Sequence, residues 1–280
     1  MLSAEQIQNN WESFLQIVKD NVPGKRGEIL YNFFVEHEER FALMPASGKT
    51  SYHNAFPGGY IDHVIRVFHL SHEFSNLWYT SGANTPDEEE ISFVALVHDL
   101  GKFGDLQHEE YLPQDQDWAK KRGEEYKHNP DIPFMKTAER SLFLLQQLGV
   151  KVSHDEYLGI KLHDGLYEES NKSYYISYSE EYRLRSNLAY IVHQADLLAC
   201  RIEFDNFHSP KPIVKVKPSV TKTELGKLHI PKDDCTATFT ATEYNSKPQP
   251  KTRIENVLPP PAPKPKIQGG KYAALLNKLK

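Results

Sequence analysis

The sequence predicts an all-α fold followed by a partly extended, proline-rich and basic C-terminal tail. Apolar residues recur three or four positions apart through most of the first 208 residues, which is the spacing of one helix face. Few residues in this part alternate between apolar and polar as strands do. The ranges expected to be helical are 4–20, 25–43, 61–79, 88–101, 136–149, 154–164 and 181–204.

Two predicted helices open the chain, and the residues from Ser3 to Gln6 have the pattern of a helix start. The apolar faces of these two helices are Ile7, Trp11, Phe14, Leu15 and Val18 in the first, and Ile29, Leu30, Phe33, Phe34 and Phe41 in the second. Pro45, Gly48 and the run Pro57-Gly58-Gly59 then predict a loop, because proline and glycine interrupt helices.

The helix expected over 61–79 carries a histidine at the start of its inward face. The stripe at helical spacing consists of His63, Arg66, Val67, Leu70 and Phe74. His69 and His72 lie off this stripe, so we expect them to be exposed. In the following helix, an apolar run over 91–97 leads directly into the pair His98-Asp99.

A second His-Asp pair, His154-Asp155, has a simpler explanation. Ser153 with Glu156 three residues later forms the pattern of a capping box, so this copy is expected to be a helix start. The last long helix of the body, 181–204, is expected to bury Leu188, Ile191, Val192, Ala195, Leu198 and Ala199.

Composition changes after residue 208 and divides the chain into three parts. Residues 1–208 form the helical domain, and 209–245 form a small β-prone extension with alternation over 236–242. Residues 246–280 form a proline-rich linker and a short basic amphipathic peptide over 271–280. This peptide is expected either to dock on a protein partner or to fray, because ten residues are marginal for an isolated helix.

Charge is distributed unevenly along the 280 residues. Residues 209–280 contain 14 Lys and Arg against 5 Asp and Glu, whereas residues 1–208 contain 19 against 33. An acidic body argues against a protein that coats nucleic acid along its whole surface, since such binding neutralises phosphates with basic side chains. The basic tail is expected to bind nucleic acid or to act as a solvated linker.

The sequence shows no membrane-length apolar stretch and no secretory signal pattern, which predicts a cytoplasmic protein with no membrane partner. Cys200 and Cys235 are too few for a metal quartet and are expected to be free thiols.

The pair His98-Asp99 is the strongest chemical signal in the chain. Imidazole and carboxylate groups are costly to bury unless something compensates them, and a metal ion compensates both. Nitrogen and oxygen donors without thiolate suit a divalent ion such as Mn²⁺, Mg²⁺, Co²⁺, Ni²⁺ or Fe²⁺. For any one such residue alone, a hydrogen-bonded polar group in the core is the alternative.

The order of His63, then His98-Asp99 within His98-Asp99-Leu100-Gly101-Lys102, then Asp196 resembles the H…HD…D signature of the HD-domain metal-dependent phosphohydrolases. The match covers roughly residues 50 to 200. The segment 52–59 also resembles the one that precedes the first ligand in HD-type 3′→5′ exoribonucleases. The resemblance implies an HD-domain helical bundle in which His63, His98, Asp99 and Asp196 bind the metal.

Two further residues are expected to be catalytic. Lys102 lies three residues after Asp99, on the same side of a helical end, where it can bind a phosphate oxygen; the alternative is a solvent-facing lysine. His163 resembles a later histidine of many HD proteins, which binds a second metal or assists substrate and water. Where similar proteins often carry another histidine for a second metal, this chain has Thr137 or nearby Lys136, which favours a single ion.

Substrate contacts are expected from His53, Arg66, His128 and Arg140, and Arg183 and Arg185 are further candidates. For each of them, a surface ion pair is the alternative. The predicted activity is hydrolysis of a phosphate ester in a nucleotide or oligonucleotide by metal-activated water, as in a phosphodiesterase, nucleotidase or nuclease. A catalytically weak module that senses nucleotides, or that binds a partner through its tail, is the alternative. A two-iron oxygenase is disfavoured by Thr137.

Overall fold

The computed structural model describes residues 1–177, 179–208 and 271–278, and the expectations for 209–270 lie outside this part. The described residues are mostly helical, which confirms the all-α prediction. The α-helices are α1 (Ala4–Asn21), α2 (Gly24–Glu36), α3 (Glu38–Leu43), α4 (Gly59–Thr80), α5 (Glu88–Val97), α6 (Asp117–Lys120), α7 (Thr137–Gln147), α8 (His154–Leu162), α9 (Lys172–Tyr175), α10 (Leu188–His208) and α11 (Lys271–Lys278). Three short 3₁₀ helices are η1 (Leu100–Phe103), η2 (Gly165–Tyr167) and η3 (Glu169–Asn171).

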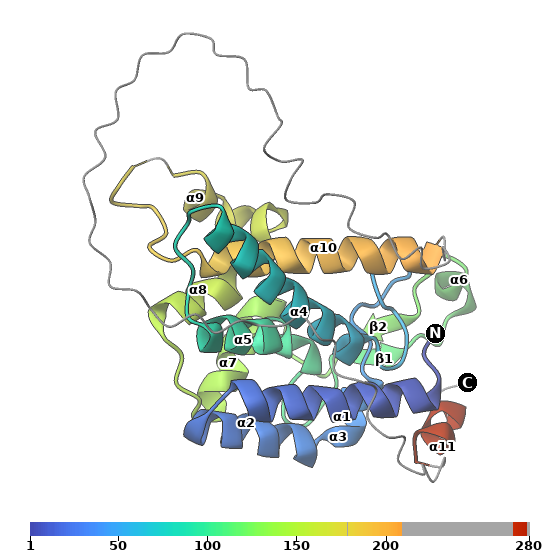
Figure 1. Ribbon diagram of the computed structural model, residues 1–280. Coiled ribbons are helices and arrows are strands. Elements are labelled where there is room, and N and C mark those ends of the chain that lie inside the picture. The colour runs from blue at the N-terminus through green and yellow to red at the C-terminus, as the bar shows by residue number, and fades with distance from the viewer. Residues whose placement is uncertain (178, 209–270, 279–280) are drawn as a thin grey trace, which may run out of the picture. The chain divides into compact units, whose positions relative to one another are not determined.

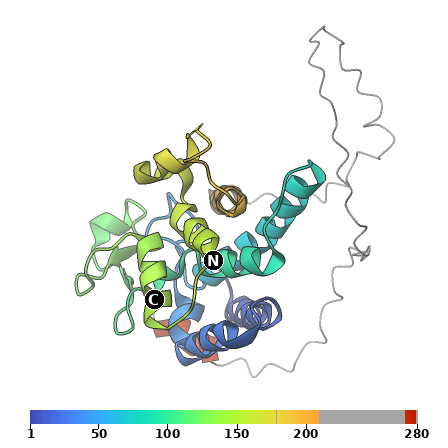
Figure 2. The same ribbon diagram turned by 90° about the vertical axis from the view of Figure 1, so that its left-hand side faces the viewer.

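Helices α4 and α5 form the centre of the described fold. In Figure 1 they lie between α10 on one side and α1 on the other, and the turned view in Figure 2 shows the same separation. Helix α4 makes its most extensive contacts with α10 and α5, and α10 also packs on α8. Helices α4 and α10, which carry predicted metal ligands, and α5, which ends directly before two of them, therefore share one core with α8.

Helix α1 begins at the predicted start. Ser3 and Gln6 form a capping box, in which each side chain bonds the other's backbone N–H. Its buried face is Ile7, Trp11, Phe14 and Val18. Phe14 meets Phe34 of α2 edge to face, with ring centroids 4.8 Å apart. The apolar spacing in the sequence thus identified the packing face correctly.

Several helix boundaries differ from the prediction: α5 ends at Val97 instead of 101, α10 extends to His208 instead of 204, and two further differences have a visible local cause. The range 25–43 is two helices, because His37 leaves the helical conformation at φ −110° and ψ 29°. The helix predicted from 181 begins at Leu188, where the Ser186 hydroxyl accepts the Leu188 N–H at 3.2 Å. Ser and Asn compete with helical hydrogen bonds through their side chains, which favours a helix start after them.

A two-stranded antiparallel sheet, unanticipated as such, lies between η1 and α7. Strand β1 (Tyr111–Pro113) pairs with β2 (Tyr126–His128), and Tyr111 faces His128 in register. At three residues each, these strands are too short for a period-two pattern to stand out in the sequence. The sheet places Tyr111 beside the site described below.

The C-terminal residues 271–278 form the predicted short helix, α11. It contacts α1, and the hydroxyl of the buried Tyr272 donates a hydrogen bond to Glu38 at 2.5 Å.

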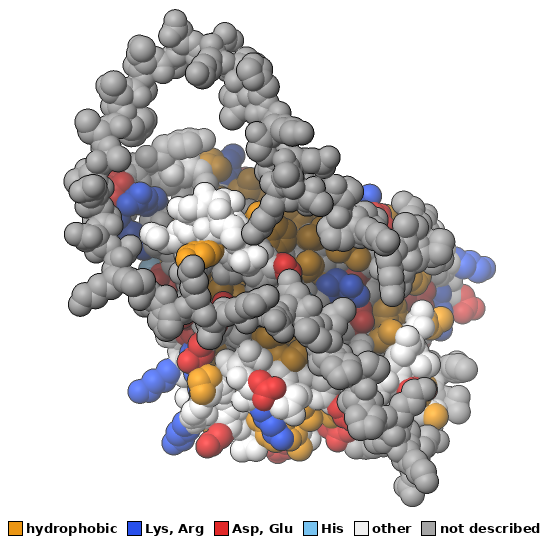
Figure 3. Space-filling model, viewed as in Figure 1, with side chains coloured by type: hydrophobic (Ala, Val, Ile, Leu, Met, Phe, Trp, Pro, Cys, Tyr) orange, Lys and Arg blue, Asp and Glu red, His pale blue; other side chains and the backbone are white. Residues whose placement is uncertain are grey.

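Within the described residues, no helix combines the length and apolar character needed to cross a membrane. On the face seen in Figure 3, acidic and basic side chains are interspersed rather than gathered into a basic surface.

Ser141 of α7 holds the segment that follows α5. Its buried hydroxyl accepts the Gly101 N–H at 2.7 Å and lies 2.9 Å from the carbonyl oxygen of His98. We expect Ser141→Ala to lower the free energy of unfolding by about 1–3 kcal/mol, because it leaves a buried N–H without its partner. Urea denaturation measures this loss. Ser13→Ala, at an exposed position of α1, is the control and should change stability by less than about 0.5 kcal/mol; equal effects would contradict the assigned role.

Candidate metal centre

Five buried or nearly buried side chains from four parts of the chain lie close together. His63 comes from α4, His98 and Asp99 follow α5, His163 follows α8, and Asp196 comes from α10. His63 Nε2 lies 3.2 Å from Asp196 Oδ1, 3.5 Å from Asp99 Oδ2 and 3.4 Å from His98 Nε2. His163 Nε2 lies 3.4 Å from the other oxygen of Asp99. This cluster could hold a metal ion.

The spacing of the donor atoms fits a shared cation. Metal bonds of about 2.1 Å place neighbouring donor atoms about 3.0–3.4 Å apart, and most of the distances above fall close to this range. Two imidazole nitrogens that face each other at 3.4 Å can share only one proton. A single ion would satisfy both nitrogens and both carboxylates at once.

The three histidines are oriented by the atoms that hold their Nδ1 nitrogens. His98 Nδ1 lies 2.8 Å from the carbonyl oxygen of Ala95, and His163 Nδ1 lies 2.8 Å from that of Ile160. A carbonyl can only accept, so each of these rings donates from Nδ1, which leaves Nε2 facing the cluster. Both histidines follow the last turn of a helix, where a carbonyl three residues earlier is free to accept. Metal-binding histidines are commonly fixed in this way.

His63 is held by a carboxylate that the sequence analysis missed. Glu203 of α10 is 2% exposed and lies 3.2 Å from His63 Nδ1. Arg66, expected at the substrate, instead donates to Glu203 at 3.0 Å and to Asp62 at 3.2 Å. Asp196, Cys200 and Glu203 recur at i, i+4 and i+7, so helical spacing was the available signal for one polar face.

The carboxylates outnumber the nearby cations, and this shifts the protonation of the cluster. Burial alone would lower the pKa of His63, but Glu203 and Asp196 outweigh it and raise that pKa to about 10. Burial is likewise outweighed at His163, where Asp164 and Asp99 raise the pKa to about 10. At His98, burial dominates and lowers the pKa to about 4. Without a metal ion, protons on two histidines therefore offset the carboxylate charge.

Lys102 forms an ion pair with Asp99 of the cluster. Its Nζ lies 2.5 Å from Asp99 Oδ2, and only 12% of its side chain is exposed. Burial opposes the charge of the ammonium, but Asp99 reverses this effect and raises the pKa of Lys102. The side chain thus carries a fixed positive charge beside the cluster, rather than facing solvent after the Gly101 turn.

A cavity of about 530 Å³ opens onto the cluster. Asp99, Lys102, His163 and Asp196 lie on its wall, together with His53, Thr137 and His193. Its aromatic lining residues are Tyr52, Tyr111, Tyr167 and Phe204, and its cationic side chains besides the histidines are Lys102 and Arg201. Sequence reasoning did not single out Tyr111, Phe204 or Arg201, because nothing in their spacing distinguishes them.

The remaining predicted residues are divided between this cavity and other places. His53 lines the cavity, with its ring centroid 4.7 Å from that of His63. His128 lies on β2 with 76% of its side chain exposed and pairs with Glu110. Arg140 is 7% exposed and also pairs with Glu110, while donating to the Pro133 carbonyl oxygen. Neither His128 nor Arg140 lines the cavity beside the cluster.

Three further expectations have clear outcomes among the described residues. Ser153 and Glu156 form the predicted capping box, which makes His154 a helix start. His69 is exposed as expected, whereas His72 is half-buried and bonds Ser92 and Glu88. Arg183 and Arg185 both pair with Glu180 and line a different cavity.

Comparison with known proteins found no matching family model, no matching curated protein and no matching solved structure. What the protein does must therefore be inferred from its own residues.

We predict that loading the metal-free protein with Mn²⁺ at pH 7.5 releases between one and two protons. His63 and His163 have pKa values near 10, so both are protonated at this pH and must lose a proton to bind an ion. Titration calorimetry in two buffers of different ionisation enthalpy counts the protons. Release of one proton is the number expected when His63 alone is deprotonated, and release of two is expected when His163 also loses its proton beside the ion.

The sign of the pH dependence follows from the raised pKa values. Apparent Mn²⁺ affinity should rise as pH increases toward 10, because fewer protons then compete with the ion. Binding that releases no proton and does not change with pH would contradict the protonation state assigned to the cluster.

We expect Glu203→Ala to weaken Mn²⁺ binding by about 10–100-fold, since it removes the carboxylate that orients His63. Glu203→Gln, which keeps an acceptor oxygen, should weaken binding less and guards against a general folding defect. Asp205→Ala removes an exposed carboxylate from the same helix and should leave the dissociation constant unchanged. If Glu203→Ala, shown to be folded by circular dichroism, matched the wild type, the orienting role would be wrong.

Proposed function

We propose that this protein is an HD-type metal-dependent phosphohydrolase that cleaves a phosphate ester in a nucleotide or a short oligonucleotide. The observation that carries the proposal is the meeting of three imidazoles and two carboxylates beside a cavity whose wall also holds Lys102. Nitrogen and oxygen donors favour Mn²⁺, Mg²⁺, Co²⁺, Ni²⁺ or Fe²⁺. A cavity with a few convergent polar groups is the usual form of a small-molecule site.

His63, His98, Asp99 and Asp196 would hold one divalent ion. When bound, such an ion lowers the pKa of a coordinated water and stabilises charge on phosphoryl oxygens. The residues themselves do the orienting: Glu203 aligns His63, and the carbonyl oxygens of helix ends align His98 and His163. His163, which lines the cavity, would assist the water or the leaving group.

Lys102 is suited to bind the substrate phosphate. It is fixed by Asp99 at 2.5 Å and still lines the cavity, so one ammonium proton can reach a phosphate oxygen. Lys102 and Arg201 are the only lysine and arginine among the described lining residues. Two cations suit one phosphate group better than a triphosphate, which carries more negative charge than they can offset.

The aromatic lining supports a substrate that carries a base. Tyr52, Tyr111, Tyr167 and Phe204 surround the cavity, and aromatic side chains stack on nucleobases without regard to sequence. Single aromatic contacts of this kind contribute about 1–3 kcal/mol per base. A nucleoside monophosphate, or the end of a short single strand, fits these features together.

The proposal is tested by a screen for hydrolysis. Nucleoside mono-, di- and triphosphates, cyclic nucleotides and short oligonucleotides are incubated with Mn²⁺, Mg²⁺, Co²⁺ or Ni²⁺, and the products are separated by chromatography. Asp99→Ala should lower turnover at least about 100-fold, because loss of a ligand exceeds the effect of losing an outer partner.

The second His-Asp pair provides the matched control. His154 begins α8 with 81% of its side chain exposed, so His154→Ala should keep full activity. If the protein bound Mn²⁺ and nucleotides but hydrolysed none of these substrates, the proposed hydrolase activity would be wrong. The alternative, a module that senses nucleotides, would then be favoured.

A further inference from the structure

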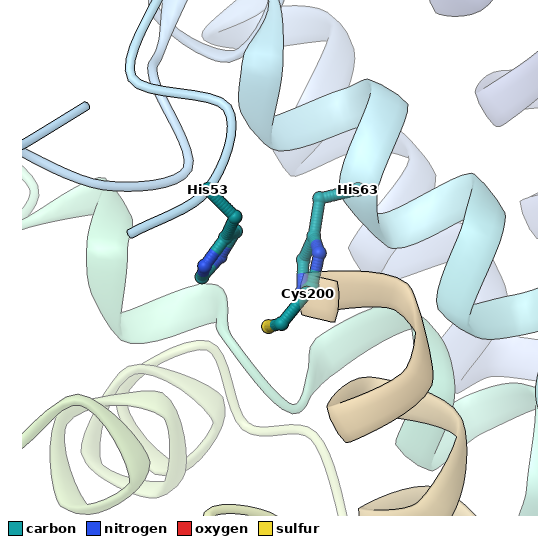
Figure 4. Close-up of side chains that lie close together, drawn as sticks. All are labelled: His53, His63 and Cys200. Carbon is teal, nitrogen blue, oxygen red and sulfur yellow. The ribbon is translucent and has the colours of Figure 1, made fainter. Parts of the chain in front are cut away.

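Beside the nitrogen and oxygen cluster lies a second group of donor atoms that includes a thiol. Figure 4 shows His53, His63 and Cys200 pointing toward one another from three segments. One donor atom from each lies within 4.8 Å of the other two. His53 precedes α4, whereas Cys200 follows Asp196 by one turn of α10, so the fold rather than local sequence brings them together.

His53 has a ring nitrogen that is ready to bind. Its Nε2 is buried and has no hydrogen-bond partner among the described residues. The Ser47 hydroxyl donates to the His53 carbonyl oxygen at 2.6 Å, which ties down the loop that carries the ring. Burial, with the nearby charges of Lys102 and His63, lowers the pKa of His53 and keeps the ring neutral. An unpaired buried nitrogen is costly, and a bound cation would remove that cost.

Cys200 is held as a thiol against the same cluster. Its Sγ lies 3.4 Å from Asp196 Oδ1, toward which the S–H can donate. Burial and the charge of Asp196 raise the pKa of the thiol, so an ion must displace its proton to bind sulfur. Coordination to a metal deprotonates a thiol outright.

We propose that His53, Cys200 and His63 form a second, thiolate-containing site that takes Zn²⁺ in preference to the harder ions. Zinc binds imidazole and thiolate together in tetrahedral sites, and thiolate ligands select it over Mg²⁺ and Mn²⁺. As zinc binds, the proton of the Cys200 thiol and the proton that His63 carries in the metal-free protein both pass to the solvent. Asp196 Oδ1, freed of the S–H, lies close enough to serve as the fourth ligand.

The two sites exclude each other because they share His63. Glu203 holds His63 Nδ1, which leaves Nε2 as the only nitrogen of this ring for an ion. When His63 Nε2 binds an ion that is also held by His53 and Cys200, it can no longer bind an ion held by His98 and Asp99. Zinc in the thiolate site would therefore displace the ion that the proposed hydrolysis requires. Given that proposed function, zinc is expected to inhibit the hydrolysis.

Cobalt substitution reads the thiolate directly, without any measurement of activity. Full-length protein titrated with Co²⁺ should develop a near-ultraviolet thiolate-to-cobalt charge-transfer band, which nitrogen and oxygen ligands do not produce. Cys200→Ser should abolish the band, whereas Cys235→Ser, which removes the other cysteine of the chain, should retain it. His53→Gln should weaken the cobalt affinity of this band at least about tenfold. Added Zn²⁺ should bleach the band in the wild type.

Two results would overturn the thiolate site. Wild-type protein that binds Co²⁺ with only weak visible bands would show that the ion avoids sulfur, and a charge-transfer band that survives Cys200→Ser would place the thiolate elsewhere. In the first case the nitrogen and oxygen centre and the proposed hydrolysis would still stand. Cys200→Ser keeps a hydroxyl that can donate to Asp196, so loss of the band would not reflect misfolding.

Discussion

The helices of the described fold pack around a cluster of negatively charged carboxylates. The carboxylates of Asp99, Asp196 and Glu203 lie close to three imidazoles and to the side chains of Lys102 and Arg66, and burial removes most of the water that would otherwise solvate them. Such an arrangement is costly unless cations compensate it. In the metal-free protein the protons on His63 and His163 fulfil this role. A single divalent ion could compensate the same negative charge, so this cluster could hold a metal ion.

Helix ends deliver most of these donors. His98 and His163 each follow the last residue of a helix, where the carbonyl oxygen three residues back fixes the ring. The apolar run of α5 anchors His98 and Asp99 in the core, and Ser141 of α7 holds the turn that follows. The helices thus set the donor positions, while the loop before α4, the strand β1 and helix α10 each supply part of the cavity wall. Donor groups of fixed position beside an open cavity are consistent with the catalytic role that we propose.

The spacing of apolar residues predicted the helices, because burial of one helix face leaves a strong pattern in the sequence. The residues proposed as ligands could be found because they lie on these inward faces or directly after them. The break at His37 and the late start of α10 depend on local hydrogen bonds that the apolar pattern does not report. Glu203 was missed because an isolated glutamate in a helix is usually exposed. Arg66 and Arg140 were expected at the substrate, yet each binds a carboxylate distant in sequence, and such partners become visible only in the fold.

We propose that His63, His98, Asp99 and Asp196 enclose one cation. Anomalous scattering from crystals of the full-length protein grown with Mn²⁺ would locate this ion. We expect one strong peak about 2.0–2.3 Å from Nε2 of both histidines and from an oxygen of each aspartate. A map with no peak between these side chains, or with manganese bound only at surface carboxylates, would contradict it.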